Sequence, residues 1–139
     1  MDINSMTGSE NANTSLKNVL LIEDDEYCAY TILKLLSKDF NIVHKFNGSE
    51  GIQETGNNMY DLLLLDIGLK DMKGTDVLKE IKNIPGYENT PSIAVTAFAM
   101  LGDKDRFLDG GFNYYISKPF SIAEFKKLIN TALASHSKE

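Results

Sequence analysis

Three carboxylates and one ammonium group follow short apolar runs at widely separated points of the chain. Asp66 comes directly after four leucines, and Glu23 and Asp24 come directly after the run Val-Leu-Leu-Ile. Lys118 follows another stretch that is typical of a strand. A carboxylate is costly to bury unless a partner offsets its charge, and clustered carboxylates repel, so at least one should have a raised pKa. These residues therefore indicate one shared site that combines acidic groups with a cation.

Segments typical of strands alternate with segments typical of helices from residue 18 onward. Continuous apolar runs predict strands covered on both faces, and apolar residues at helical spacing predict amphipathic helices. The predicted strands span 19–22, 42–46, 62–65, 92–96 and 114–117, and the predicted helices span about 26–37, 47–56, 75–83, 102–109 and 121–134. This alternation predicts a doubly wound α/β fold, with a five-stranded parallel sheet and five helices.

The carboxyl ends of the predicted strands carry the residues that could do chemistry. In a doubly wound sheet a site lies beyond these ends, where the strand order reverses. Five residues fall at that edge: Glu23, Asp24, Asp66, Thr96 and Lys118. The run Glu23-Asp24-Asp25 offers two acidic pairs. We choose Glu23 and Asp24 because they directly follow the apolar run, and we assign Asp25 as the N-cap of the next helix.

Length and composition fit a single globular domain. The chain has 139 residues, of which 42% are hydrophobic and 24% are charged. Residues 1–16, rich in Asn, Ser, Thr and Gly, are predicted to form a flexible tail before a domain over 17–135, and 136–139 form a second tail. No apolar run approaches the ~20 residues that cross a bilayer, and no secretory signal is recognisable. We therefore expect a cytoplasmic protein without a membrane partner.

Charge and cysteine content exclude further classes of protein. Lys plus Arg number 14 and Asp plus Glu number 20, so the net charge is -6. This argues against direct binding of nucleic acid, which draws most of its affinity from basic residues on phosphates. Cys28 is the only cysteine, so an internal disulfide and a thiolate zinc site are excluded. The balance fits a protein whose partners are cations or other proteins.

Five short motifs, in order and at fitting spacing, carry a resemblance to a known family. They are Leu-Ile-Glu23-Asp24-Asp25, Leu-Leu-Asp66 with Gly74 eight residues on, Ala-Val-Thr96-Ala97, Tyr115 three residues before the lysine, and Lys118-Pro119-Phe120. Residues 17–135 resemble the receiver domain of two-component response regulators, most of all stand-alone cell-cycle regulators and the receivers of hybrid kinases. The resemblance implies a flavodoxin-like sheet of strand order 2-1-3-4-5.

The resemblance implies a phosphoacceptor and a metal site. Asp66 would attack a phosphoryl group held in line, a reaction that depends mainly on positioning and charge neutralisation. Asp24, Asp66 and the backbone carbonyl of Gly68 would bind Mg²⁺ (or Mn²⁺), which prefers oxygen ligands and keeps several waters. Glu23 would act on the metal through a bound water.

The resemblance also implies a set of residues that respond to the phosphoryl group. Lys118 would contact a phosphoryl oxygen, and the bond between Lys118 and Pro119 is predicted to be cis. Thr96 would hydrogen-bond the phosphoryl group, and Tyr115 would turn inward into the space that Thr96 vacates, as in a two-state switch. The small Ala97 leaves room for the phosphoryl group.

Each of these residues also has a plainer interpretation. Glu23 and Asp24 could be an acidic cluster at a helix N-terminus. Lys118 could be a surface lysine, Thr96 a hydroxyl at a strand end, and Tyr115 a half-buried aromatic residue. Their shared register favours the functional interpretation.

Three positions of the motif region leave questions open. Lys70 stands four residues after Asp66, where the family usually has proline, which predicts a more mobile loop without loss of a reacting side chain. Gly68 and Phe98 occupy the positions that tune the access of water to the phosphorylated aspartate in the family. Gly68 leaves access open and Phe98 could shield it, so the lifetime of the phosphorylated form stays open.

Aromatic and apolar residues near the last strand and helices suggest a partner-binding face. The residues of this predicted face are Phe98, Met100, Leu101, Phe120 and Phe125. Exposed apolar patches often mark partner sites, whereas the alternative is that most of these residues are core. His44 is predicted to be structural and to lie far from the site.

The function we expect is that of a response regulator in two-component signal transduction. A sensor histidine kinase or a histidine phosphotransfer protein would donate a phosphoryl group to Asp66, and a downstream protein or a phosphorelay would take the output. The chain could also be the receiver module of a hybrid kinase. An aspartate-nucleophile phosphohydrolase is disfavoured because such enzymes carry a second Asp where Gly68 stands, and a scaffold without the switch is disfavoured by the complete residue set. We therefore expect that the protein is not an enzyme, apart from catalysing its own phosphorylation and dephosphorylation.

Overall fold

Five parallel strands form one sheet in the order β2-β1-β3-β4-β5, as predicted. The computed structural model describes residues 16–97 and 103–135, so the predicted tails lie outside it except for Leu16. The strands are β1 (Asn18–Ile22), β2 (Asn41–Lys45), β3 (Leu62–Asp66), β4 (Ser92–Thr96) and β5 (Tyr114–Ser117). The order reverses between β1 and β3, which places a crevice at their carboxyl ends.

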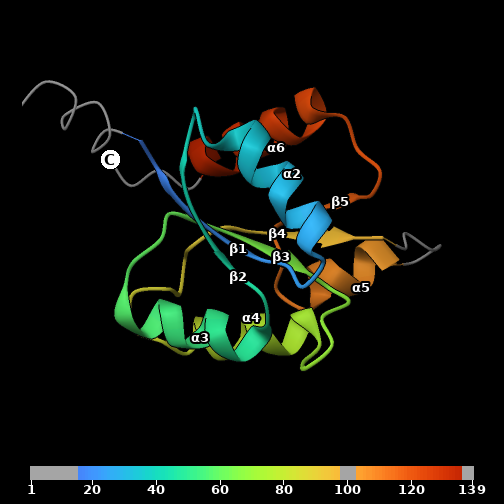
Figure 1. Ribbon diagram of the computed structural model, residues 1–139. Coiled ribbons are helices and arrows are strands. Elements are labelled where there is room, and N and C mark those ends of the chain that lie inside the picture. The colour runs from blue at the N-terminus through green and yellow to red at the C-terminus, as the bar shows by residue number, and fades with distance from the viewer. Residues whose placement is uncertain (1–15, 98–102, 136–139) are drawn as a thin grey trace, which may run out of the picture.

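Helices cover both faces of the sheet, as a doubly wound fold requires. The helices among the described residues are α2 (Glu26–Leu36), α3 (Gly48–Asn57), α4 (Gly74–Lys82), α5 (Asp103–Asp109) and α6 (Ile122–Ser135). Helices α2 and α6 lie on one face, and α3, α4 and α5 lie on the other (Figure 1).

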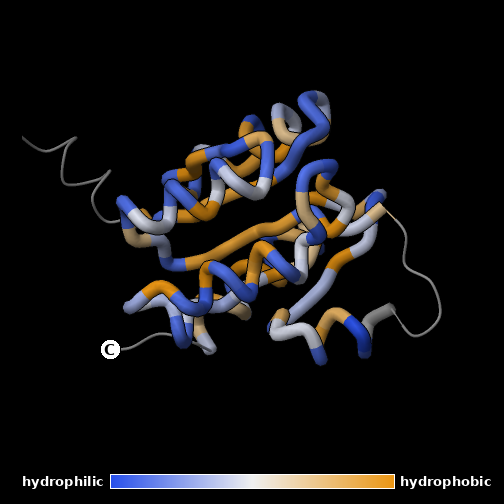
Figure 2. Tube along the Cα trace, turned by 90° about the horizontal axis from the view of Figure 1, so that it is seen from below, coloured by the Kyte–Doolittle hydropathy of each residue, from blue (hydrophilic) through white to orange (hydrophobic). Residues whose placement is uncertain are grey.

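The three inner strands, β1, β3 and β4, carry the core. All four leucines of β3 are fully buried, and they alternate between the two faces of the sheet because successive side chains of a strand point in opposite directions. Leu62 and Leu64 pack with α2 and α6, whereas Leu63 and Leu65 pack with α4 and α5. Figure 2 shows the hydrophobic strands enclosed between helices whose outer sides are polar. The continuous apolar runs thus mark the buried strands, and the polar residues that follow them emerge at the sheet edge.

Capping side chains mark the starts of α2 and α6. The side chain of Asp25 accepts a hydrogen bond from the Tyr27 N–H at 3.0 Å, which confirms it as the N-cap of α2. Ser121 Oγ accepts from the Glu124 N–H at 3.0 Å at the start of α6. The predicted strand 42–46 is displaced by one residue. Strand β2 is an edge strand without a buried side chain, so its apolar pattern does not mark its ends.

Candidate functional site

The carboxyl ends of the strands enclose a cleft of about 510 Å³. Its lining includes every predicted metal-binding and phosphoryl-binding residue except Tyr115, namely Glu23, Asp24, Asp66, Gly68, Thr96, Ala97 and Lys118. Arg106 and Phe107 of α5 also line the cleft, and no motif had singled them out. The predicted residues come from four separate segments of the chain and meet in one place, as their positions after the strands predicted.

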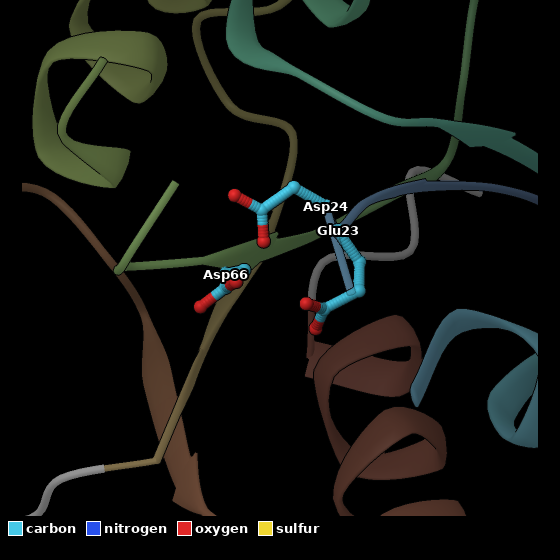
Figure 3. Close-up of side chains that lie close together, drawn as sticks. All are labelled: Glu23, Asp24 and Asp66. Atoms are coloured by element: carbon cyan, nitrogen blue, oxygen red, sulfur yellow. The ribbon is translucent and has the colours of Figure 1, made fainter. Parts of the chain in front are cut away.

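Three carboxylates face a common space in this cleft. Oxygen atoms of Glu23, Asp24 and Asp66 all lie within 4.8 Å of one another (Figure 3). Glu23 is fully buried, Asp66 is 7% exposed and Asp24 is half-buried. Such a group of hard oxygen donors, open on one side, fits the ligand preference of Mg²⁺.

The electrostatics of Asp66 follow from burial beside a second acid. Burial, together with the hydrogen bond and negative charge of Glu23, raises the pKa of Asp66 to about 6. The Gly68 N–H, which donates to Asp66 Oδ1 at 3.0 Å, and the charge of Lys118 act in the opposite direction. At neutral pH Asp66 is therefore ionised. Its negative charge is unfavourable in this buried position, and a bound cation would stabilise it.

Lys118 is paired with Glu23. Its Nζ lies 3.0 Å from Glu23 Oε1, while Glu23 Oε2 accepts the Asp25 N–H at 3.1 Å. Burial lowers the pKa of Lys118, but the hydrogen bond and charge of Glu23 outweigh burial and leave that pKa raised. The backbone N–H of Lys118 donates to the Thr96 carbonyl at 2.7 Å. Both carboxylate oxygens of Glu23 are thus engaged with groups of the protein, and Lys118 is held at the rim of the carboxylate cluster.

Two residues that the sequence analysis did not assign to the site lie near Glu23. His44 Nε2 lies 2.7 Å from the Glu23 carbonyl oxygen, so the prediction that His44 lies far from the site is wrong. Cys28 of α2 is half-buried, and burial together with the charge of Glu23 raises its pKa to about 11. The pairing of Leu21 with His44 in the β1–β2 ladder brings the histidine to this end of the sheet. The position of His44 could have been predicted only from the register between β1 and β2.

The loop between β3 and α4 contacts the acidic cluster at the position of the missing proline. The Lys70 N–H donates a hydrogen bond to Asp24 Oδ2 at 3.0 Å. The next residue, Asp71, accepts hydrogen bonds from the Gly48 N–H at 2.9 Å and the Ser49 N–H at 3.0 Å, at the start of α3. The loop is therefore hydrogen-bonded both to Asp24 and to the start of α3, whereas we had predicted a more mobile loop from the lysine at position 70.

The predicted switch residues lie on the neighbouring strands β4 and β5. Thr96 is 4% exposed at the end of β4, and Tyr115 is half-buried on β5, with its ring centroid 6.1 Å from that of Phe107. In the β4–β5 ladder, Ala94 pairs with Tyr115. The bond between Lys118 and Pro119 is cis, which confirms that prediction.

The predicted partner face needs a correction. Phe125 is fully buried in the core between α6 and the sheet, so it is wrong as a surface residue. Phe120 is half-buried, with its ring centroid 4.6 Å from that of Phe125, and Phe98, Met100 and Leu101 lie outside the described residues. Large hydrophobic side chains that are exposed in the described part of the chain lie elsewhere: Tyr27, Tyr30, Leu35, Val43, Phe46 and Met59.

Comparison with known proteins defines the class. The family model of the response regulator receiver domain matches residues 19–130. The chain therefore belongs to the response regulator receiver family and acts in two-component signal transduction. No helix in the part of the chain that the structure describes is long and apolar enough to cross a membrane.

Particular relatives refine this assignment. The polar-differentiation response regulator DivK of Brucella anthropi is 36% identical over 118 residues, which make up 84% of this chain and 96% of that protein. DivK of Brucella ovis is 35% identical over the same shares of the two chains.

Solved receiver structures agree with the fold. The receiver domain of a sensor histidine kinase from Pseudomonas aeruginosa PAO1 gives a TM-score of 0.79 at 27% identity, covering 86% of this chain and 98% of that one. That structure has a magnesium ion coordinated in its active-site cleft. A CheY-like receiver domain protein from Methanospirillum hungatei JF-1 gives a TM-score of 0.80 at 26% identity, covering 87% of this chain and 96% of that one.

Proposed function

We propose that Asp66 accepts a phosphoryl group from a phosphohistidine of a sensor histidine kinase or of a histidine phosphotransfer protein. The observation that carries this proposal is the cleft in which a nearly buried aspartate, two further acids, a lysine and a strand-end threonine meet. An oxygen of Asp66 forms the new bond to phosphorus as the bond between phosphorus and the donor nitrogen breaks. At neutral pH the carboxylate is ionised and ready to attack, because its pKa of about 6 lies below the ambient pH.

The acidic residues of the cleft fit a divalent cation. Asp24 and Asp66 supply carboxylate oxygens, and the backbone carbonyl of Gly68 is the third protein ligand in the proposal. When bound, Mg²⁺ (or Mn²⁺) would supply the positive charge that offsets the repulsion between a carboxylate and a phosphoryl group. The magnesium ion in the related receiver from Pseudomonas aeruginosa supports this choice of metal. Glu23 would contribute through a water, in addition to the ion pair that it forms with Lys118.

The remaining residues of the cleft would read the phosphoryl group. Lys118 would leave Glu23 and contact a phosphoryl oxygen once Asp66 is phosphorylated. Its flexible side chain can exchange one anionic partner, the Glu23 carboxylate, for another, the phosphoryl group. Thr96 donates its hydroxyl to the phosphoryl group beside the small Ala97, and Tyr115 turns inward as Thr96 moves. These changes would shift the balance between two states that differ in partner binding.

The proposed partners follow from the family. The donor is a phosphohistidine protein, and the recipient is a downstream protein or the next member of a phosphorelay. The likeness to the receiver of a sensor kinase favours relay as the second candidate role. Hydrolysis of free phosphoesters is not part of the proposal, because Gly68 provides no side chain where a general acid would be needed. A cytoplasmic location and the absence of a nucleic-acid or membrane partner stay predictions.

The experiment that tests this function is intact-protein mass spectrometry after incubation with acetyl phosphate and Mg²⁺. The wild type is expected to gain one phosphoryl group, and Asp66→Asn none. Asp76→Asn, an exposed acid on α4, serves as the matched control and should behave as the wild type. If Asp66→Asn is still phosphorylated, or if a purified phosphohistidine donor transfers nothing to the wild type, the proposal is wrong.

A further inference from the structure

The β3–α4 loop holds a hydrogen bond that the usual family sequence could not make. Lys70 donates its backbone N–H to Asp24 Oδ2 at 3.0 Å. Proline, the usual residue at this position in the family, has no N–H to donate. The Lys70 side chain is exposed, so the contact with Asp24 depends on the backbone and on the residue not being proline.

A second contact fixes the donor in place. Asp71 follows directly and receives the N–H groups of Gly48 and Ser49 at 2.9 and 3.0 Å. The hydrogen bond from Gly48 is the largest contribution to the lowered pKa of Asp71, so this carboxylate stays ionised and anchored well below neutral pH. A carboxylate at a helix N-terminus is also favoured by the helix dipole. The loop is thus pinned to α3 at one residue and bonded to Asp24 at the residue before it.

We propose that the Lys70 N–H is a positioning group for Asp24, which it orients for binding of the divalent cation. This inference rests on the proposed function and deepens it. The bond occupies Oδ2, and an oxygen of Asp24 lies within 4.8 Å of the oxygens of Asp66 and Glu23. A hydrogen bond to a metal-ligating carboxylate fixes its rotamer before the metal arrives, so less side-chain freedom is lost on binding. The lysine in place of proline thereby adds an orienting contact to the site.

The first test separates the backbone N–H from the lysine charge by titration calorimetry of Mg²⁺ on the full chain. Lys70→Pro removes both the N–H and the ammonium group, and it is expected to weaken Mg²⁺ binding by about tenfold. Lys70→Ala keeps the N–H and removes only the ammonium group, so it should bind Mg²⁺ at least as tightly as the wild type. Equal affinities of Lys70→Pro and Lys70→Ala would overturn the inference.

The second test reads the bond itself, by amide hydrogen exchange without metal. The Lys70 amide is expected to be protected in the wild type, to lose protection in Asp24→Ala, and to keep much of it in Asp24→Asn, which retains an acceptor oxygen. An unprotected Lys70 amide in the wild type, or one indifferent to Asp24→Ala, would overturn the inference even if Lys70→Pro failed to fold. Absence of Mg²⁺ binding in the wild type would instead count against the proposed metal site, so the two failures are distinguishable.

Discussion

The Nζ atom of Lys118 lies 3.0 Å from Oε1 of Glu23, a carboxylate with 1% of its side chain exposed. The pair joins the residue that follows β1 to the residue that follows β5, and both residues line the cleft. Because Glu23 is withdrawn from water, its charge depends on this partner, whereas the lysine, 20% exposed, can turn toward another anion.

Removal of the lysine should therefore cost stability as well as phosphotransfer. Lys118→Ala leaves Glu23 without its cation and is expected to lower the free energy of unfolding by about 2 kcal/mol. Lys126→Ala breaks a more exposed ion pair with Asp39, also 3.0 Å long, and should cost about 0.5 kcal/mol or less. Urea unfolding at pH 7 measures both values. Equal losses would show that burial of Glu23 does not depend on Lys118.

The choice of acidic pair is tested by neighbouring alanine variants. Asp24→Ala removes an oxygen donor of the cluster, so it should weaken Mg²⁺ binding and slow phosphorylation by acetyl phosphate. Asp25→Ala removes the N-cap of α2 and should cost about 1 kcal/mol of stability without a change in Mg²⁺ affinity. Calorimetric titration with Mg²⁺ separates the two effects. A loss of affinity in Asp25→Ala, together with an unchanged affinity in Asp24→Ala, would count against the choice of Glu23 and Asp24.

The raised pKa of Asp66 predicts a particular pH dependence of the metal-free protein. The folded value is about 6 and the ordinary value is 3.8, so between them the folded state holds a proton that the unfolded state releases. The contribution of Asp66 to stability is therefore complete below about pH 3.8 and is lost as pH rises through 6.

Urea unfolding of the wild type and Asp66→Asn in the presence of a chelator, from pH 4.5 to 7, measures this contribution. The asparagine variant should gain stability relative to the wild type as pH rises, because it lacks the carboxylate that becomes charged. Stability curves that run parallel across this range would contradict the assigned pKa shift.

A glycine at the start of α4 is required by close packing behind Asp66. A Cβ at Gly74 would lie 2.8 Å from the Asp66 carbonyl oxygen and 2.9 Å from Ile67 Cα, both of them backbone atoms that cannot yield cheaply. Gly74→Ala should cost about 1–3 kcal/mol. Gly56, in α3, has no atom within 4 Å of such a Cβ, so Gly56→Ala should stabilise by about 0.5–1 kcal/mol. Thermal unfolding measures whether each substitution stabilises or destabilises the protein. An unchanged stability of Gly74→Ala would show that the backbone moves to make room for the Cβ.

Residue types and their order along the chain were sufficient to predict the sheet and the place of the site. Apolar runs marked the buried strands, and the polar residues after them converged because parallel strands end at one edge. The sequence already contained a signal that Phe125 is a core residue, although we assigned it to the partner face. It lies on the same helical stripe as Ile129 and Ala132, which indicates the core, and it is buried with them.

The contacts that complete the site leave no such signature in the sequence. The bond from Lys70 to Asp24 uses a backbone N–H that every residue but proline has, so residue type alone does not reveal it. The approach of His44 to the Glu23 carbonyl depends on the register between β1 and β2. The pairing of Lys118 with Glu23, 95 residues apart, depends on the side-chain conformations chosen within the cleft.

The central claim is that Asp66 carries the phosphoryl group, and reduction of the phosphorylated protein with borohydride tests it most directly. Hydride converts an aspartyl phosphate to homoserine, which peptide mass spectrometry locates. The account predicts homoserine at position 66 in wild type treated with acetyl phosphate and Mg²⁺, and none when either reagent is omitted. Homoserine at position 24, or at any aspartate other than Asp66, would contradict it.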